Sequence, residues 1–277
     1  KEHFHAGIHR EATIPGSSLK GTIRTALLAR FIMDKPDFVK KQANLGQNKS
    51  KGFKFDDTGL QSNYLSDLKT NRRGTFSPNA NQDILRFLRI SDFHFKDTAS
   101  AKCEIINKYN DSWGVKTRES SFIECITAKQ QPTGSLQIPQ DLLKAVRKAK
   151  YIKNNSLAKI DIETIFGIIN ANTLRLVQTE LDFWDGEGCP VLVNNYFDQL
   201  EIIEERLKNI PPNTCIMRVG AGSGWDYMTG SWAKEKDKND NHIIEDDDLW
   251  FTMQDQTRRS KKYYSDDVPF PKTRKIL

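Results

Sequence analysis

A short basic segment near the start of the chain combines several groups that bind phosphate in proteins. A proline–glycine turn at positions 15–16 leads into Ser17 and Ser18, and an apolar repeat at helical spacing follows. Either serine hydroxyl could cap this helix, leaving other backbone N–H groups at the positive end of the helix dipole. Lys20 and Arg24 are four residues apart and share one helix face. The segment suits a bound phosphate; an ordinary capped helix with a solvated basic edge is the alternative.

A glycine-rich segment far downstream is the second candidate. It follows the apolar run 214–217, which predicts a strand. Three glycines within five positions let the backbone approach a ligand closely and adopt positive φ. A cation and an indole ring flank these glycines. The candidate residues are Arg218, Gly220, Gly222, Ser223, Gly224 and Trp225. A tight turn that needs glycine only for its geometry is the alternative.

Two familiar nucleotide-binding motifs do not fit these segments. In the first segment Lys20 precedes Gly21, whereas a P-loop places its lysine directly after a glycine that ends a four-residue gap. In the second segment Trp225 stands where the dinucleotide fingerprint has its last glycine. Neither segment predicts an NTP or NAD site.

Several blocks of the sequence, including both segments, resemble a known family. Residues 14–21 with Arg24 resemble the signature that opens the first helix of RAMP-superfamily CRISPR proteins. The order of the remaining blocks is similar to that in the fifth Csm subunit of type III-A effector complexes. These blocks are Leu88–Asp92, Phe122–Ile126, Arg218–Trp225 and Pro271–Arg274.

This resemblance implies a fold, a role and a set of partners. The implied fold is α+β, a ferredoxin-like (RRM-like) RAMP fold with a helical region. The implied role is to cap the backbone filament, to bind the crRNA near its 3′ end and to support crRNA maturation in antiviral defence, without cleaving RNA. The implied partners are the crRNA, other Csm subunits, especially the neighbouring backbone subunit, and host ribonucleases. We expect Lys20 and Arg24 to neutralise RNA phosphates beside the glycine-rich segment, and we expect no cofactor or metal.

Two features depart from the family's pattern. The chain begins at Lys1, and we recognise no first strand of the ferredoxin-like fold ahead of Ile14, so we expect the amino-terminal part of the fold to be incomplete. The glycine-rich segment also carries Val219 and Ala221, where larger apolar residues are common.

Composition limits the class of protein. The 277 residues are 37% hydrophobic with a mean hydropathy of −0.63, and no run approaches the roughly 18 apolar residues of a membrane helix. The four cysteines are widely spaced, which favours reduced thiols in a cytoplasmic protein. A net charge of +6 suits a basic stripe and an acidic partner such as nucleic acid.

The chain divides into three expected parts. Residues 1–139 form the ferredoxin-like core, residues 140–210 a helical region, and residues 211–277 the glycine-rich segment with a basic tail. Within the first part, the polar stretch 35–82 predicts a long excursion, and 84–90 predicts a strand.

Two further patterns describe the middle of the chain. Residues 122–127 and 135–138 predict a hairpin, and Pro139 suits the start of a helix. Apolar stripes at helical spacing predict two more helices with core-facing sides. They cover 162–184, with a break near Gly167 or Asn170, and 196–207, ended by Pro211-Pro212.

No catalytic constellation can be assembled from spacing. His3, His5 and His9 form the only histidine cluster, which we assign to an exposed terminus. Asp92 could act as a general base, but a cap or turn at a strand end is the favoured interpretation. The acidic run 245–248 is typical of a solvated face rather than a metal site. We therefore expect a non-enzymatic protein.

Three interpretations stay open. The first is an RNA-binding subunit, the second a RAMP endoribonuclease that processes or cuts RNA, and the third a protein scaffold whose glycines serve packing. Basic residues interleaved with tyrosines at 258–275 could track RNA, and a solvated basic tail is the alternative.

Overall fold

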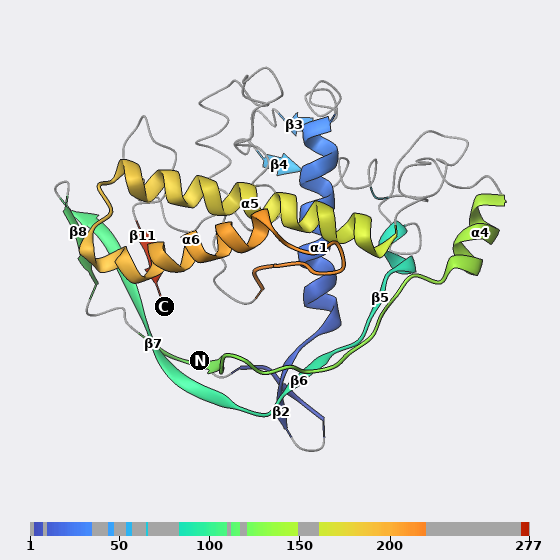
Figure 1. Ribbon diagram of the computed structural model, residues 1–277, viewed down its shortest axis with the longest axis horizontal. Helices are drawn as coiled ribbons and strands as arrows, with labels where there is room; N and C mark the ends of the chain where they lie inside the picture. The colour runs from blue at the N-terminus through green and yellow to red at the C-terminus, as the bar shows by residue number, and fades with distance from the viewer. Residues whose placement is uncertain are drawn as a thin grey trace.

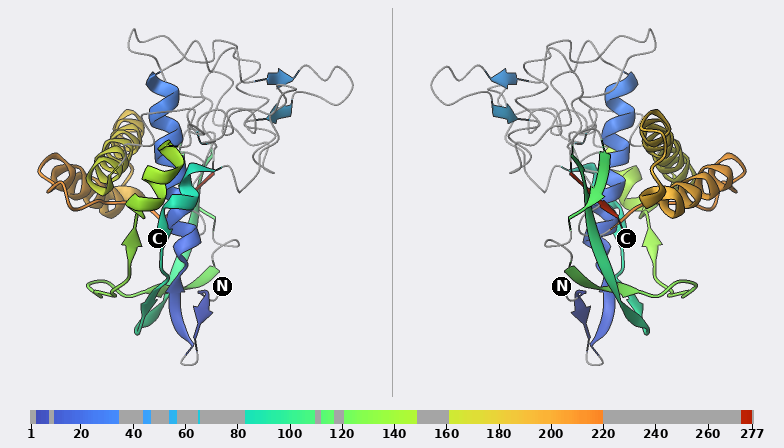
Figure 2. Two further views of the ribbon diagram at one scale, coloured as in Figure 1. Left: turned by 90° about the vertical axis from the view of Figure 1, so that its right-hand side faces the viewer. Right: turned by 90° about the vertical axis from the view of Figure 1, so that its left-hand side faces the viewer.

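Two long helices and one long curved strand frame the molecule (Figure 1). The computed structural model describes residues 3–7, 10–34, 44–46, 54–56, 65, 83–109, 112–116, 121–148, 161–219 and 273–276. Helix α5 (Ile162–Gly186) packs against both α1 (Gly16–Asp34) and α6 (Asn194–Lys208). The strands β3 (Asn44–Gly46) and β4 (Lys54–Asp56) lie on the side of α1 opposite to α5 and α6 (Figure 2).

A small antiparallel sheet precedes α1. Its strand order is β1 (His5–Ala6), β2 (Glu11–Ile14) and β6 (Phe93–Phe95). The expectation that no strand lies ahead of Ile14 was wrong, because β2 leads directly through Pro15 into α1. β2 has only four residues, too few for its polar–apolar alternation to stand out in the sequence, and its burial does not follow that alternation because both central residues are buried.

The principal core forms around α1. The helix buries Ile23, Leu27 and Leu28, which are spaced so that they follow the side facing α5 and the segment around residue 85. Ile165 and Ile169 of α5 complete the contact. The apolar repeat of the sequence therefore predicted this helix and its buried face correctly.

Residues 84–90 do not form the predicted strand. A 3-10 turn, η2 (Ile84–Phe87), precedes the two-residue strand β5 (Arg89–Ile90). The carboxylate of Asp83 accepts a hydrogen bond from the N–H of Leu85 at 2.8 Å, which stabilises the start of the turn. The turn buries three of its four residues in the principal core, whereas a strand with one buried face would bury every second residue.

The predicted hairpin of 122–127 with 135–138 was also wrong. Strand β9 (Ser121–Ile126) pairs antiparallel with β7 (Thr98–Tyr109), and β10 (Leu136–Gln137) pairs with β5. Each half thus finds a partner earlier in the chain rather than its neighbour. β7 pairs in addition with β8 (Ser112–Val115) and with β11 (Thr273–Ile276), which brings part of the basic carboxyl-terminal segment into a sheet.

The predicted helices agree better with the structure. Helix α4 (Gln140–Lys148) begins directly after Pro139, whose carbonyl accepts from the N–H of Leu143. α6 follows the turn η5 (Val191–Val193) and ends three residues before Pro211, as expected. The predicted break in α5 was wrong: its 25 residues are continuous, and Asn170 uses its side chain on a neighbouring segment instead.

A second, aromatic core joins the long strand to the helices. Trp184 of α5 is fully buried and meets Trp113 of β8 and Phe183 edge to face, with ring centroids 5.0 Å apart in both pairs. Ile106 of β7 belongs to the same cluster. In the part of the chain that the structure describes, no helix is both long and apolar enough to cross a membrane.

Candidate functional site

The start of α1 is fixed by a contact from another part of the chain. The N–H of Gly16 donates to the carboxylate of Asp92 at 2.8 Å, so Asp92 has the capping role that the sequence favoured over a general base. α1 begins at Gly16, which places Ser17 and Ser18, both exposed, inside the first turn rather than at the cap position. The expectation of a serine cap is therefore replaced by a carboxylate cap from a residue that follows β5.

Position 16 must be a glycine, because the backbone of the segment that carries Asp92 passes too close for a side chain. A Cβ at this position would lie 2.3 Å from the carbonyl oxygen of Ile90 and 2.8 Å from that of Ser91. No side chain fits at such distances. Two of the sequence blocks, 14–21 and 88–92, thus form one unit of structure.

The two cations of α1 differ in their surroundings. Arg24 forms an ion pair with Asp83, the residue that also caps η2. Lys20 is half-buried and has no ion-pair partner among the described residues. Burial, and next the nearby Arg24 charge, lower the pKa of Lys20. A bound anion would favour the charged form of Lys20 and so oppose both effects, and Lys20, unlike Arg24, has no carboxylate partner among the described residues.

The segment before the glycines is held by side chains of α5 and not by a strand. The Asn170 amide donates to the Thr214 carbonyl at 2.9 Å and accepts from the Ile216 N–H at 3.0 Å. The hydroxyl of Thr173 donates to the Ile216 carbonyl at 2.8 Å. These bonds replace a sheet partner, which is why the predicted strand at 214–217 is absent from the structure.

This segment leads toward the same core as α1. Cys215 and Met217 pack against the principal core that contains Ile23 and Leu27. Burial raises the pKa of the Cys215 thiol to about 11, so it stays protonated and acts as an apolar side chain. Arg218 is half-buried and is the last predicted site residue that the structure describes. The others in this segment lie outside the described residues; they are Gly220, Gly222, Ser223, Gly224 and Trp225.

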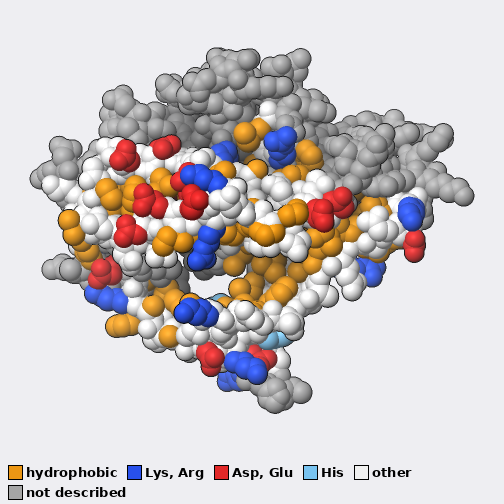
Figure 3. All heavy atoms as spheres, viewed as in Figure 1, with side chains coloured by type: hydrophobic (Ala, Val, Ile, Leu, Met, Phe, Trp, Pro, Cys, Tyr) orange, Lys and Arg blue, Asp and Glu red, His pale blue; other side chains and the backbone are white. Residues whose placement is uncertain are grey.

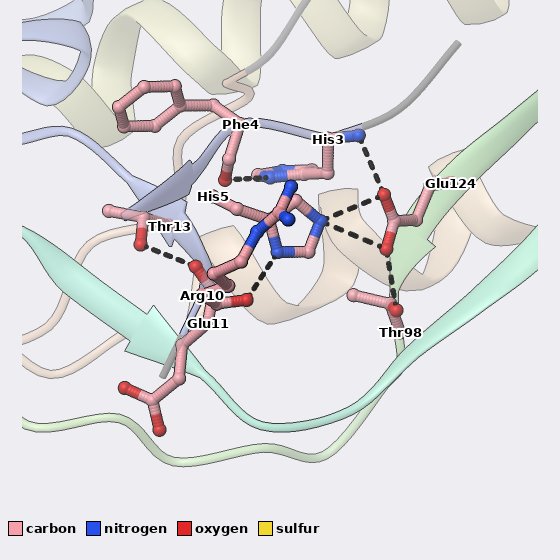
Figure 4. A network of polar contacts seen from close by, with 8 residues as sticks. All are labelled: His3, Phe4, His5, Arg10, Glu11, Thr13, Thr98 and Glu124. Carbon is pink, nitrogen blue, oxygen red and sulfur yellow. Dashed lines mark hydrogen bonds and ion pairs between the residues drawn. The ribbon is translucent and has the colours of Figure 1, made fainter. Parts of the chain in front are cut away.

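A polar network that the sequence did not predict surrounds Glu124 of β9 (Figure 4). Its carboxylate accepts from the backbone N–H of His3 at 2.8 Å and from the hydroxyl of Thr98 at 2.8 Å. The Nε2 of His5 lies 3.0 Å from the same carboxylate. The assignment of His3 and His5 to an exposed terminus was therefore wrong, whereas His9 lies outside the described residues. The positions of His3 and His5, two residues apart, could have indicated that they act together. The sequence could not show that their partner is Glu124, more than a hundred residues away.

The protonation state of His5 follows from its contacts. Its Nδ1 lies 2.6 Å from the carbonyl oxygen of Arg10, and its Nε2 faces the Glu124 carboxylate. Because both partners are acceptors, both contacts are hydrogen bonds only when each ring nitrogen carries hydrogen, that is, in the imidazolium form. The Glu124 bond, and next the Arg10 bond, raise the pKa of His5, while the bonds from His5, His3 and Thr98 lower the pKa of Glu124 to about 2. Among the described residues, no cluster of three metal-binding side chains occurs.

Comparison with known proteins gives a fold. No protein-family model matches the chain, and no curated protein matches it in sequence. A chain of a cryo-EM structure of a Csm–crRNA–target RNA ternary complex of a type III-A CRISPR–Cas system is similar, with a TM-score of 0.65 and 18% identity. The likeness covers 98% of this chain and 71% of that one.

A second solved structure has a related fold. The crystal structure of Csm5 from T. onnurineus matches 81% of this chain with a TM-score of 0.53 and 15% identity, and the match covers 64% of that protein. This chain therefore matches less than two thirds of that protein's length. The predicted α+β fold is confirmed, and it is similar to the fold of these two structures.

Proposed function

We propose that this RAMP-fold chain is an RNA-binding subunit of a type III-A CRISPR–Cas (Csm) effector complex. The observation that carries the proposal is the match of 98% of the chain to one chain of a Csm–crRNA–target RNA complex. The proposed position and role within the complex rest on the ordered series of sequence blocks, which resembles that of the fifth Csm subunit. The chain caps one end of the backbone filament, contacts the crRNA near its 3′ end and supports crRNA maturation.

The start of α1 supplies the electrostatic part of this role. Lys20 is set in the first turns of a helix whose N-terminal dipole also attracts anions. Arg24 adds positive charge, partly offset by Asp83. The segment 214–218, held by Asn170, leads into the glycines that we propose approach the RNA backbone. In this proposal the partners are the crRNA and the adjoining Csm subunits, and a host ribonuclease performs the trimming.

We further propose that the chain does not hydrolyse RNA. The only histidine–carboxylate ion pair among the described residues is His5 with Glu124, and it is the pair that the second candidate, a RAMP endoribonuclease, would have to use. A general base, however, needs an unprotonated nitrogen that can reach the ribose hydroxyl. Both nitrogens of His5 are already occupied as donors. This geometry is that of a structural ion pair.

Native mass measurement tests the proposal. The chain is co-expressed with the other Csm subunits and a guide RNA, and the assembly is purified through a tag on a backbone subunit. We expect a species that contains this chain and the guide, and no RNA cleavage by the chain alone. An assembly that forms completely without the chain would contradict the proposed role. RNA cleavage that disappears in His5→Asn would instead support the endoribonuclease.

A further inference from the structure

An open hollow of about 530 Å³ lies where the amino-terminal strands meet β7 and β9. None of its lining residues belongs to α1. The residues that matter for its chemistry are His5, Arg10, Thr98, Ser100, Phe122 and Glu124. It thus combines charge, hydroxyl groups and one large aromatic ring.

The hollow has an excess of positive charge. Glu124 is its one carboxylate, and His5 neutralises it as an imidazolium. Arg10 supplies a further cation to the same wall, and its charge acts on His5. In Figure 4, the Arg10 side chain runs beside the His5 ring, whereas Glu11 points away from the network. An anion entering the hollow therefore meets a net attraction.

The backbone holds Arg10 in a rarely adopted conformation. Its φ is +50°, a left-handed value that is uncommon for residues other than glycine, asparagine and aspartate. Its N–H donates to the Gly7 carbonyl at 3.2 Å, and its carbonyl accepts from His5 at 2.6 Å. The His5–Glu124 pair thus fixes the turn from which Arg10 extends. Such strain persists where the surroundings impose it, and it is common at binding sites.

Phe122 provides a surface on which a ring can stack. Its side chain is 70% exposed. In the β7–β9 register, Ser100 lies opposite Glu124 and Lys102 opposite Phe122, so these four residues share one face of the sheet. Lys102 is paired with Glu104, so Arg10 is the cation of the hollow that accompanies this ring. An exposed aromatic ring together with a cation is an arrangement by which proteins bind single-stranded nucleic acid without sequence preference.

We propose that this hollow binds one nucleotide of single-stranded RNA, with the phosphate at Arg10 and the base on Phe122. The hydroxyl of Ser100, which is exposed, is available to the ribose or the phosphate. The inference rests on the proposed function in one respect, that the chain binds RNA. It adds a contact remote from α1, so the bound strand follows a longer path over the protein.

The test compares variants of the full chain in binding to a fluorescent single-stranded RNA over a range of salt concentrations. Arg10→Asn removes the charge and keeps a residue that tolerates left-handed backbone. Lys129→Asn is the matched control, since Lys129 is also an exposed cation with positive φ, at +67°, and does not line the hollow. Phe122→Ser removes the ring. Melting temperatures of all variants establish that they are folded.

We expect Arg10→Asn to lower the log–log salt slope by about 0.7, the value for one phosphate contact on a single strand. We expect Phe122→Ser to weaken binding roughly five- to hundredfold. Lys129→Asn should leave the slope unchanged. In addition, a photo-crosslinking amino acid at position 122 should yield an RNA adduct.

Three results overturn the inference, and they differ in what they say of the proposed function. If Arg10→Asn and Phe122→Ser bind as the unmodified chain does, while Lys20→Ala is weakened, the hollow is not an RNA site but the RNA-binding function stands. If the unmodified chain binds no RNA at all, both fail. Equal slopes for Arg10→Asn and Lys129→Asn also overturn it, because only overall charge then matters.

Discussion

His5 and Glu124 join two parts of the chain that are far apart in sequence, and their titration predicts a pH dependence. The pKa of His5 is raised above 6.5, so its contribution to stability is complete below pH 6.5 and is lost as the pH rises through the folded value. The pKa of Glu124 falls from 4.5 to about 2, so its contribution is present above pH 4.5 and is lost toward pH 2. The pair stabilises most between pH 4.5 and 6.5.

Melting temperatures of the unmodified chain and Glu124→Gln, measured across pH, test this. The difference between the two should be largest in that window and smaller at pH 8. A difference that stays constant from pH 5 to pH 8 would show that His5 is not titrating against Glu124.

Gly16 and Gly21 form a matched pair on one helix. Gly16→Ala places a Cβ against the Ile90 carbonyl and should destabilise the protein by at least about 1–3 kcal/mol. A Cβ at Gly21 would meet no other atom within 4 Å, so Gly21→Ala should stabilise the helix by about 0.5–1 kcal/mol. Chemical denaturation of both variants measures these changes. Equal effects at the two positions would mean that the Ile90 carbonyl leaves room for a Cβ at position 16.

Lys20 is the residue on which the electrostatic proposal depends most. Lys20→Ala should reduce the log–log salt slope of RNA binding by about 0.7. Lys144→Ala is the control, because it removes the same charge from an exposed position on α4. If both variants change the slope equally, the effect is one of net charge and no phosphate is bound at α1.

At the scale of elements, the segment 214–216 depends on α5 for its hydrogen bonds. Asn170→Ala removes the partner of the Thr214 carbonyl and of the Ile216 N–H and should cost about 1–1.5 kcal/mol. Asn209→Ala is the control: Asn209 is exposed, and its amide donates to Glu205 within the same stretch of chain, so the change should stay within about 0.5 kcal/mol. Because the segment leads to the glycines, Asn170→Ala should also weaken RNA binding. If folded Asn170→Ala binds RNA with unaltered affinity, the segment 214–216 does not contribute to RNA binding.

Elements with local causes were predictable from the sequence. The helices α1, α4 and α6 follow from apolar periodicity and from prolines at their ends. The pairing of the strands was not predictable, because β9 pairs with β7 and β10 pairs with β5. These contacts are non-local, and no turn motif in the sequence indicates them. The 3-10 turn at 84–87 was missed for a similar reason, since its burial depends on α1 and α5.

At the scale of the whole molecule, two sequence blocks of the family resemblance meet in space. Blocks 14–21 and 88–92 touch through Gly16 and Asp92, and block 122–126 is β9. The resemblance thus predicted the fold but not the network around Glu124, whose members lie near the start and the middle of the chain. Nor do the described residues show a continuous basic stripe on the face in Figure 3, where acidic and basic side chains mix over α5 and α6. Attraction for RNA is therefore expected from local sites.

Protection of the guide RNA tests the central claim most directly. Csm complexes are assembled with and without this chain, treated with a 3′-to-5′ exoribonuclease, and the surviving guides are sized by sequencing. With the chain present, the guide should keep a defined 3′ end, and Lys20→Ala should make that end more accessible. Without the chain, the guide should be shortened. Identical guide lengths in complexes with and without the chain would contradict the account.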